Sequence, residues 1–450
     1  MICHSTNHSA SSCSQAQQLF DVSAFSDLDA LEELLAQIEC IEEVDRARQL
    51  LLLFGRCKSL PSHAHPNARA DLTQNSYENM QTECPITLLF KNLTGPILPK
   101  HRQAVTDLLD SIIVCRSRIV PASFTTEEGF EQLALLISIL NTNCHQLNSL
   151  TQCPEVGGSG IFIFASLCEH SCTPNCNFTS VGTELFVYAL KKIEPHTALS
   201  IDYLNVCQYM PTSWRKAELQ KRYGFECECD ACKEVERCRA FYCPKRDCGG
   251  IIHLYSEGMK CSMCLTILSD GQKQQYLRVE EDVARRLRCF SSDTEEEKMN
   301  GYEELPSDIE ADALLAEIDR ITQLRLIHPA HWVLFHSRQT VAQAMAERLT
   351  SEPSFSMQCL QLFTLQLSCL EYVCPSLNEG KIVYYDTAAQ VAIGAGEIQS
   401  ASNWFRTAAE ISAVCCGKDH PSTLQLLNFA EKTPTTLEEL GRRWRGKAAI

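Results

Sequence analysis

Clustered cysteines are the residues of this sequence whose type and spacing most clearly imply chemistry. The chain has 26 cysteines among 450 residues, and Cys227, Cys229 and Cys232 form a Cys-x-Cys-x2-Cys cluster. Cys172 and Cys176 precede this cluster by about fifty residues. Four thiolates from distant parts of a chain bind one tetrahedral zinc ion and leave no open position for catalysis. The spacing therefore predicts a structural zinc site, which one of the two upstream cysteines completes.

A second group of cysteines follows within about thirty residues. It consists of Cys243-x4-Cys248 and Cys261-x2-Cys264, with glycines between the two pairs. Two short cysteine knuckles joined by a hairpin are typical of a zinc ribbon. We therefore predict a ribbon at residues 233–272; the alternative is that these four thiols are unpaired. Single cysteines in apolar, helix-like stretches, such as Cys369, are predicted to be small buried hydrophobic residues.

The overall composition limits the class of protein. A length of 450 residues allows two to four domains with a sizeable core. The formal net charge of -16 argues against direct nucleic-acid binding, which needs concentrated lysine and arginine. No uninterrupted apolar run reaches eighteen residues, so no membrane span is predicted. The first fifteen residues lack the basic start and apolar core of a signal peptide, which favours zinc over disulfides for the clustered cysteines.

Composition and periodicity divide the chain into the segments that must position these cysteines. The predicted segments are a disordered N-terminus (1–25), a helical region (26–150), a β-rich region with the first cysteine cluster (151–232), the ribbon (233–272), a helical domain (273–435) and a basic flexible tail (436–450).

Individual elements are predicted from apolar spacing and from capping residues. Helices are expected at 100–114, 126–140, 212–223, 313–327, 331–349, 357–374, 381–393 and 398–415, and Gly224 is a C-cap signal. Strands are expected at 161–165, 184–190 and 198–204, and an acidic loop at 293–312. The glycine turn at 157–160 lacks the Lys-Ser/Thr pair of a phosphate-binding loop and precedes a strand, which argues against phosphate binding.

Three strings of the β-rich region resemble the SET domain of protein-lysine methyltransferases, and specifically the SET-and-MYND (SMYD) family. They are EHSCTPN (169–175), KKIEPHTALSIDYL (191–204) and RKAELQKRYGFECECDAC (215–232). LNTNCHQL (140–147) and GKDHP (417–421) are similar to the family's loop before the SET core and to the close of its C-terminal domain. The resemblance covers residues 26–430, and the combination is more specific than any single string.

The resemblance implies a fold and an activity. The implied fold is α+β: a partial SET β-core with a zinc-bound post-SET segment, a helical insertion before it and a tetratricopeptide-like α-helical C-terminal domain. The implied activity is transfer of a methyl group from S-adenosylmethionine to a lysine of a histone or another protein. The implied residues are catalytic Tyr203; cofactor-binding Asn143, Glu169, His170, Tyr203 and Phe225; Tyr223 in the substrate channel; and zinc ligands Cys172, Cys227, Cys229, Cys232, Cys243, Cys248, Cys261 and Cys264.

The resemblance also implies partners and a location. A lysine-containing peptide or histone tail is the expected substrate, and a chaperone or peptide is the expected partner of the helical C-terminal domain. The expected location is cytoplasmic and nuclear, without direct nucleic-acid or membrane binding.

The sequence departs from the family pattern at three places. Glu169 stands where the family has asparagine, and His196-Thr197-Ala198 replaces its Gly-Glu-Glu turn. Nothing before Gly55 resembles the family's Gly-x-Gly strand pair, and Cys3, His4, His8 and Cys13 are too few for a MYND finger. We therefore expect the chain to start inside the helical insertion. The alternatives are an inactive SET-containing scaffold that binds partners through its helical domain and a truncated isoform of an active enzyme.

Overall fold

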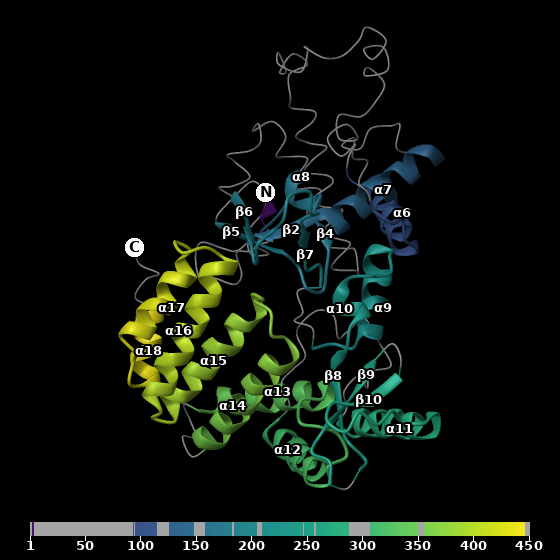
Figure 1. Cartoon of the computed structure of the whole chain (residues 1–450). Helices are drawn as coiled ribbons and strands as arrows, with labels where there is room; N and C mark the ends of the chain where they lie inside the picture. The colour runs from purple at the N-terminus through teal and green to yellow at the C-terminus, as the bar shows by residue number, and fades with distance from the viewer. Residues whose placement is uncertain are drawn as a thin grey trace. The chain divides into compact units, whose positions relative to one another are not determined.

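The computed structural model describes eleven stretches of the chain in two compact units. The described residues are 2–3, 93, 95–114, 126–147, 158–181, 184–204, 209–245, 247–255, 258–287, 307–349 and 355–445. The first unit comprises 1–168, 179–186 and 221–224, and the second comprises 169–178, 187–220 and 225–450. Figure 1 labels the helices and strands of both units.

The first unit contains a helix pair, α6 (Pro99–Val114) and α7 (Glu127–Asn143), which pack against each other. The Thr126 hydroxyl accepts a hydrogen bond from Gly129 N at 3.1 Å and so caps the first turn of α7. Leu133 and Ile137, one turn apart, are fully buried. Both helices were predicted from the spacing of their apolar residues, and the structure confirms them.

A three-stranded antiparallel sheet accompanies the helix pair in the order β1-β3-β2. Its strands are β1 (Ile2–Cys3), β2 (Cys144–Leu147) and β3 (Gly158–Ile161). Ile2 pairs with Ser159 and Cys3 with Gly158, so the predicted disorder of 1–25 is wrong for these two residues. The rest of that segment lies outside the described residues, as do His4, His8 and Cys13.

The strand predicted at 161–165 is also corrected. Strand β3 ends at Ile161, and the next apolar residues form a single helical turn, α8 (Ile163–Ser166). A short apolar run does not by itself distinguish a strand from a helix.

Short strands surround the HSCTPN turn, which belongs to the second unit, whereas residues 179–186 of the strand pair that follows this turn belong to the first unit. Strands β4 (Glu169–His170) and β7 (Ser200–Ile201) pair in parallel, and β5 (Cys176–Val181) and β6 (Glu184–Ala189) form a separate two-stranded sheet. The prediction of a strand at 184–190 is confirmed, whereas the strand predicted at 198–204 shrinks to two residues.

The post-SET segment and the ribbon follow. Helix α9 (Thr212–Tyr223) has the predicted bounds and ends at Gly224, whose φ of 75° is the left-handed conformation of a helix C-cap. A short helix, α10 (Asp230–Lys233), then leads into an antiparallel sheet of β8 (Glu236–Tyr242), β9 (Ile251–Tyr255) and β10 (Gly258–Cys261).

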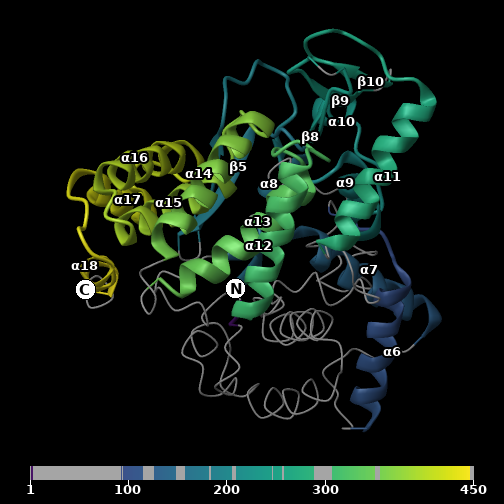
Figure 2. The same ribbon diagram turned by 90° about the horizontal axis from the view of Figure 1, so that it is seen from below.

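Eight helices make up the rest of the described chain. They are α11 (Asp270–Arg286), α12 (Asp308–Gln323), α13 (Trp332–Glu347), α14 (Ser356–Val373), α15 (Gly380–Gly394), α16 (Ile398–Cys415), α17 (Pro421–Glu431) and α18 (Leu437–Arg445). From α12 to α17 each helix packs against the next, and Figure 2 shows α15, α16 and α17 side by side. A largely helical C-terminal region was predicted and is confirmed.

Two segment boundaries predicted in this region, those of the acidic loop and of the C-terminal tail, were wrong. The acidic loop was predicted to reach residue 312, but α12 begins at Asp308 because Ser307 and Glu310 form a capping box. The tail predicted at 436–450 contains α18, whose Trp444 ring lies 5.7 Å from the ring of Phe429.

One buried apolar cluster runs through the second unit from the ribbon to the last helices. It includes Phe241 in β8, Phe335 in α13 and Phe405 in α16, each 1% exposed or less. The Tyr209 ring stacks on Phe335 with centroids 3.6 Å apart. Cys369 is 5% exposed within this cluster, as predicted for a small hydrophobic residue. None of the helices in the described ranges combines the length and the apolar composition that spanning a bilayer requires.

Candidate functional site

The first cysteine cluster is assembled from two parts of the second unit. The Sγ atoms of Cys172, Cys227, Cys229 and Cys232 all lie within 4.8 Å of one another. Cys172 follows β4, and the other three lie on the segment from the end of α9 to α10. Cys176, the alternative fourth ligand, is the first residue of β5 and does not belong to this group.

The second cluster lies at one end of the ribbon sheet. Cys243, Cys248, Cys261 and Cys264 also place their Sγ atoms within 4.8 Å of one another. A side chain on Gly250 would bring its Cβ to 2.5 Å from Cys261 Sγ. Glycine at this position therefore lets the backbone pass close to the thiol group.

The geometry of both clusters fits zinc. A Zn–S bond of about 2.3 Å places the corners of a tetrahedron about 3.8 Å apart. The Sγ separations are 3.7 Å for Cys172 and Cys232, 3.7 Å for Cys243 and Cys264, and 3.6 Å for Cys248 and Cys261. Sulfur donors alone, without a carboxylate or water position, suit a structural ion.

His170 joins the first cluster to the backbone of Tyr203. Its Nδ1 accepts a hydrogen bond from Tyr203 N at 3.1 Å, and its Nε2 lies 3.4 Å from Cys172 Sγ. Because Nδ1 is an acceptor, the proton of the neutral ring resides on Nε2 and points toward the thiol group. The side chain is fully buried, and burial lowers the pKa of His170 to about 4. The approach of Asp202 Oδ1 to Nδ1, at 3.9 Å, is therefore a contact with a neutral ring.

Three aromatic rings meet at this point. The ring centroids lie 5.3 Å apart for His170 and Tyr203, 6.0 Å for His170 and Phe225, and 6.3 Å for Tyr203 and Phe225. Phe225 is only two residues before Cys227. A zinc ion in the first cluster would thus fix Phe225 beside Tyr203.

Asn175 also holds this region together, although no role was predicted for it. Its Nδ2 donates to Ala198 O and its Oδ1 accepts from Ser200 N, each at 2.8 Å. These bonds tie the Thr-Pro-Asn turn to β7, two residues before Tyr203. The buried asparagine within a turn motif was a visible signal, but its partner strand lies more than twenty residues away in the sequence.

The remaining predicted site residues do not all lie in this cluster. Glu169 is exposed, and its backbone N donates to Leu199 O. Asn143, predicted in a loop, is the last residue of α7, where its Nδ2 donates to Ile139 O. Asn143 and Tyr223 belong to the first unit, whereas Tyr203 and Phe225 belong to the second. The roles of Asn143 and Tyr223 stay predictions.

Comparison with known proteins defines the class of domain that carries this arrangement. Residues 42–204 match the SET domain family. The match contains the HSCTPN turn, β7 and Tyr203, and the first cysteine cluster extends beyond its end. The chain therefore carries a SET domain followed by a cysteine-rich post-SET segment.

Curated relatives indicate which SET-domain proteins the chain is similar to. The chain is 36% identical over 118 residues to the histone-lysine N-methyltransferase SMYD3 of Mus musculus, covering 26% of this chain and 25% of the relative. It is 37% identical over 78 residues to the protein-lysine N-trimethyltransferase SMYD5 of Mus musculus, covering 17% and 19%. It is 32% identical over 107 residues to the N-lysine methyltransferase SMYD2 of Gallus gallus, covering 24% of each chain.

These matches confirm the resemblance on which the prediction rested. The chain is a SET-domain protein related to the SET-and-MYND family, and it spans a quarter or less of the length of these relatives. The lack of a MYND finger stays a prediction, because only Cys3 of the four residues Cys3, His4, His8 and Cys13 is among the described residues.

Proposed function

We propose that this chain is a protein-lysine N-methyltransferase that uses S-adenosylmethionine. The observation that carries the proposal is the placement of Tyr203. Its backbone is held by buried His170 beside four converging thiols, and its ring meets Phe225. The SMYD2, SMYD3 and SMYD5 relatives are named as lysine methyltransferases, which supports the same activity here.

The reaction needs positioning more than it needs an acid, a base or a catalytic metal. S-adenosylmethionine supplies an electrophilic methyl group on a sulfonium ion. A lysine amine that has lost its proton must approach this methyl group in line and away from water. Tyr203 would orient the amine or the methyl group through its hydroxyl. The aromatic faces of Phe225 and Tyr223 would form walls that favour a cation.

The chain's other residues would hold the cofactor and the post-SET segment. Glu169 would accept a hydrogen bond from an ammonium group, in place of the amide that the family has there. His170 and Asn143 would supply further hydrogen bonds. The zinc-bound thiols of the first cluster would keep Phe225 over the site without taking part in the chemistry.

The substrate and the partners follow from the same proposal. A lysine in a histone tail or another protein is the substrate, and the helical C-terminal region is the surface for a chaperone or peptide. We expect the protein in the cytoplasm and the nucleus.

A methyl-transfer assay tests the proposal. Zinc-loaded protein is incubated with S-adenosylmethionine labelled in its methyl group and with histones and a panel of cytosolic proteins. Transfer to lysine is expected, and Tyr203→Phe should lower its rate on the order of 10²-fold because the hydroxyl that orients the reacting groups is lost. Tyr384→Phe is the matched control, since this hydroxyl donates to Gln339 within the helical region.

An absence of transfer by folded, zinc-loaded protein to every substrate in the panel would contradict the proposed activity and favour the inactive scaffold. An equal rate for Tyr203→Phe and the unaltered protein would contradict the role proposed for the Tyr203 hydroxyl.

A further inference from the structure

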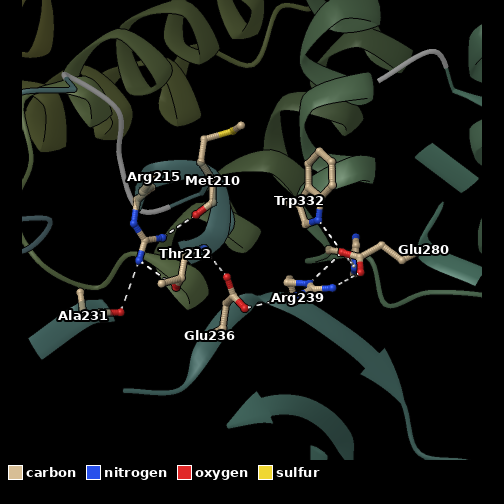
Figure 3. Close-up of polar contacts among 9 residues, drawn as sticks. Met210, Thr212, Arg215, Ala231, Glu236, Arg239, Glu280 and Trp332 are labelled. Atoms are coloured by element: carbon tan, nitrogen blue, oxygen red, sulfur yellow. Dashed lines mark hydrogen bonds and ion pairs between the residues drawn. The ribbon is translucent and has the colours of Figure 1, made fainter. Parts of the chain in front are cut away.

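A buried arginine lies against the first cysteine cluster. Arg215, in α9, is 3% exposed. Its Nη2 lies 3.8 Å from Cys232 Sγ. Figure 3 shows its other partners: Nη2 lies 3.1 Å from Thr212 Oγ1 and 3.3 Å from Ala231 O, while Nη1 donates to Met210 O. A guanidinium group is charged at all physiological pH values, so this is a buried positive charge beside four thiols.

The charges of the cluster explain why a cation suits this position. Four thiolates carry four negative charges and zinc carries two positive ones, which leaves a net charge of -2. Removing such a charge from water is costly unless an opposite charge or hydrogen-bond donors compensate it. Arg215 provides both a positive charge and a hydrogen-bond donor beside Cys232 Sγ. In the described part of the chain, no lysine or arginine side chain is bonded to the thiols of the second cluster.

The guanidinium group also connects two segments that must stay in register. Met210 O and the Thr212 hydroxyl lie at the start of α9, and Ala231 O lies in the Cys229–Cys232 turn, which carries two ligands. One planar group bonded on both sides fixes this turn relative to the helix. Lysine could not make these contacts, because its single ammonium lacks the fork of donors.

The first turn of α9, which carries Arg215, is held by a chain of paired charges that Figure 3 shows. Glu236 accepts a hydrogen bond from Thr212 N, the first amide of α9, and lies 3.6 Å from Arg239 Nη1. Arg239 binds Glu280 of α11 through two nitrogens, and Glu280 accepts from Trp332 Nε1 at 2.7 Å. Glu236 and Glu280 are 8% and 7% exposed. The start of α9 is thus anchored to the helical region through paired charges.

We propose that Arg215 is a positioning residue of the first zinc centre, which compensates the thiolate charge and fixes the Cys229–Cys232 turn. Arg215 acts on zinc retention and not on methyl transfer. A test of this role therefore gives a result that does not depend on whether the chain is a methyltransferase. The second zinc centre, at which none of the described arginines is bonded to a thiol, serves as a control in the same molecule.

Zinc release from the full chain tests this role. Zinc-loaded protein is treated with EDTA, and samples are alkylated with N-ethylmaleimide over time and mapped by peptide mass spectrometry. Peptides with Cys229 and Cys232 report the first centre, and peptides with Cys261 and Cys264 report the second. In Arg215→Gln we expect the first centre to lose zinc about 10- to 100-fold faster, as is typical for loss of an outer hydrogen bond to a metal ligand.

Two further variants sharpen the test. Arg215→Lys keeps the charge but loses the fork, so its release rate should lie between those of Arg215→Gln and the unaltered protein. If Arg215→Gln does not fold, the same comparison is made with Arg215→Lys. Arg285→Gln, at a side chain 73% exposed on α11, should change neither centre. Circular dichroism checks that each variant is folded.

The zinc release rates of the two centres test the role proposed for Arg215. Faster release confined to the first centre supports the proposal. Unchanged release from a folded variant would overturn it, and so would equal acceleration at both centres, because that indicates a general loss of stability.

Discussion

Gly417 lies where the loop between α16 and α17 meets Tyr188 of β6, and its replacement by alanine should be costly. Its φ of 101° is a conformation that residues with a side chain rarely adopt, which costs about 1–2 kcal/mol. An added Cβ would also lie 2.4 Å from Tyr188 Oη and 2.7 Å from its Cζ. Overpacking of this kind costs about 1–3 kcal/mol. We expect Gly417→Ala to lower the free energy of unfolding by about 2–5 kcal/mol.

Two other glycines separate the two contributions. Gly396 has a φ of 78° and no atom within 4 Å of an added Cβ, so Gly396→Ala should show the backbone cost of about 1–2 kcal/mol alone. Gly271, in the first turn of α11, has open space and an ordinary φ, so Gly271→Ala should stabilise by up to about 1 kcal/mol. Urea unfolding followed by circular dichroism measures the order of the three midpoints.

A second substitution identifies the source of the clash. Tyr188→Ala removes the ring that an alanine at 417 would meet, so the double variant should show a coupling of about 1–3 kcal/mol. The reasoning would be refuted if Gly417→Ala were no less stable than Gly396→Ala. It would also be refuted if the two substitutions at 188 and 417 were additive.

Three further predictions concern charge and metal. Burial raises the pKa of Asp386 from 3.8 to about 6, so the folded protein binds more protons than the unfolded chain between these values and loses stability as pH rises through this window. Asp386→Asn should therefore raise the free energy of unfolding by about 3 kcal/mol above pH 6 and change it little at pH 3.5, as measured by urea unfolding at several pH values. Asp312→Asn, at an exposed aspartate, is the control and should not have this effect. Equal effects of Asp386→Asn at all pH values would contradict the raised pKa. Glu280→Gln should destabilise by about 3 kcal/mol in thermal unfolding because it leaves the partly buried Arg239 without its main partner. An unchanged midpoint would argue against this ion pair. Cys261→Ser should lower the zinc content from about two ions per chain to about one by elemental analysis, and a content that stays at two would exclude this residue as a ligand.

Local signals allowed much of the helical structure to be predicted. The predicted bounds of α9, Thr212–Tyr223, agree with the structure, because apolar periodicity and the C-cap at Gly224 are both properties of neighbouring residues. Helix α18 was missed because its basic residues suggested a solvated tail. In the structure Leu440 is buried and the Arg443 guanidinium lies 5.0 Å from the centre of the Phe429 ring, so packing on a distant helix stabilises it.

The candidate site was predictable where a motif is contiguous. The Cys-x-Cys-x2-Cys spacing indicated a metal site, but spacing alone could not choose between Cys172 and Cys176. That choice depends on how β4 and β5 direct the chain, and the structure brings Cys172 to the cluster. Arg215 and its bonds to the turn that carries two ligands were also beyond prediction, because they depend on how α9 packs.

Calorimetric titration of the zinc-loaded protein with S-adenosylmethionine tests the central claim most directly. The proposed function predicts saturable binding of one cofactor molecule per chain. We expect weaker binding when Phe225→Ala removes the aromatic wall beside Tyr203, while Phe355→Ala, in the helical region, should leave binding unchanged. The absence of any binding to folded protein that carries both zinc ions would contradict the assignment as a methyltransferase.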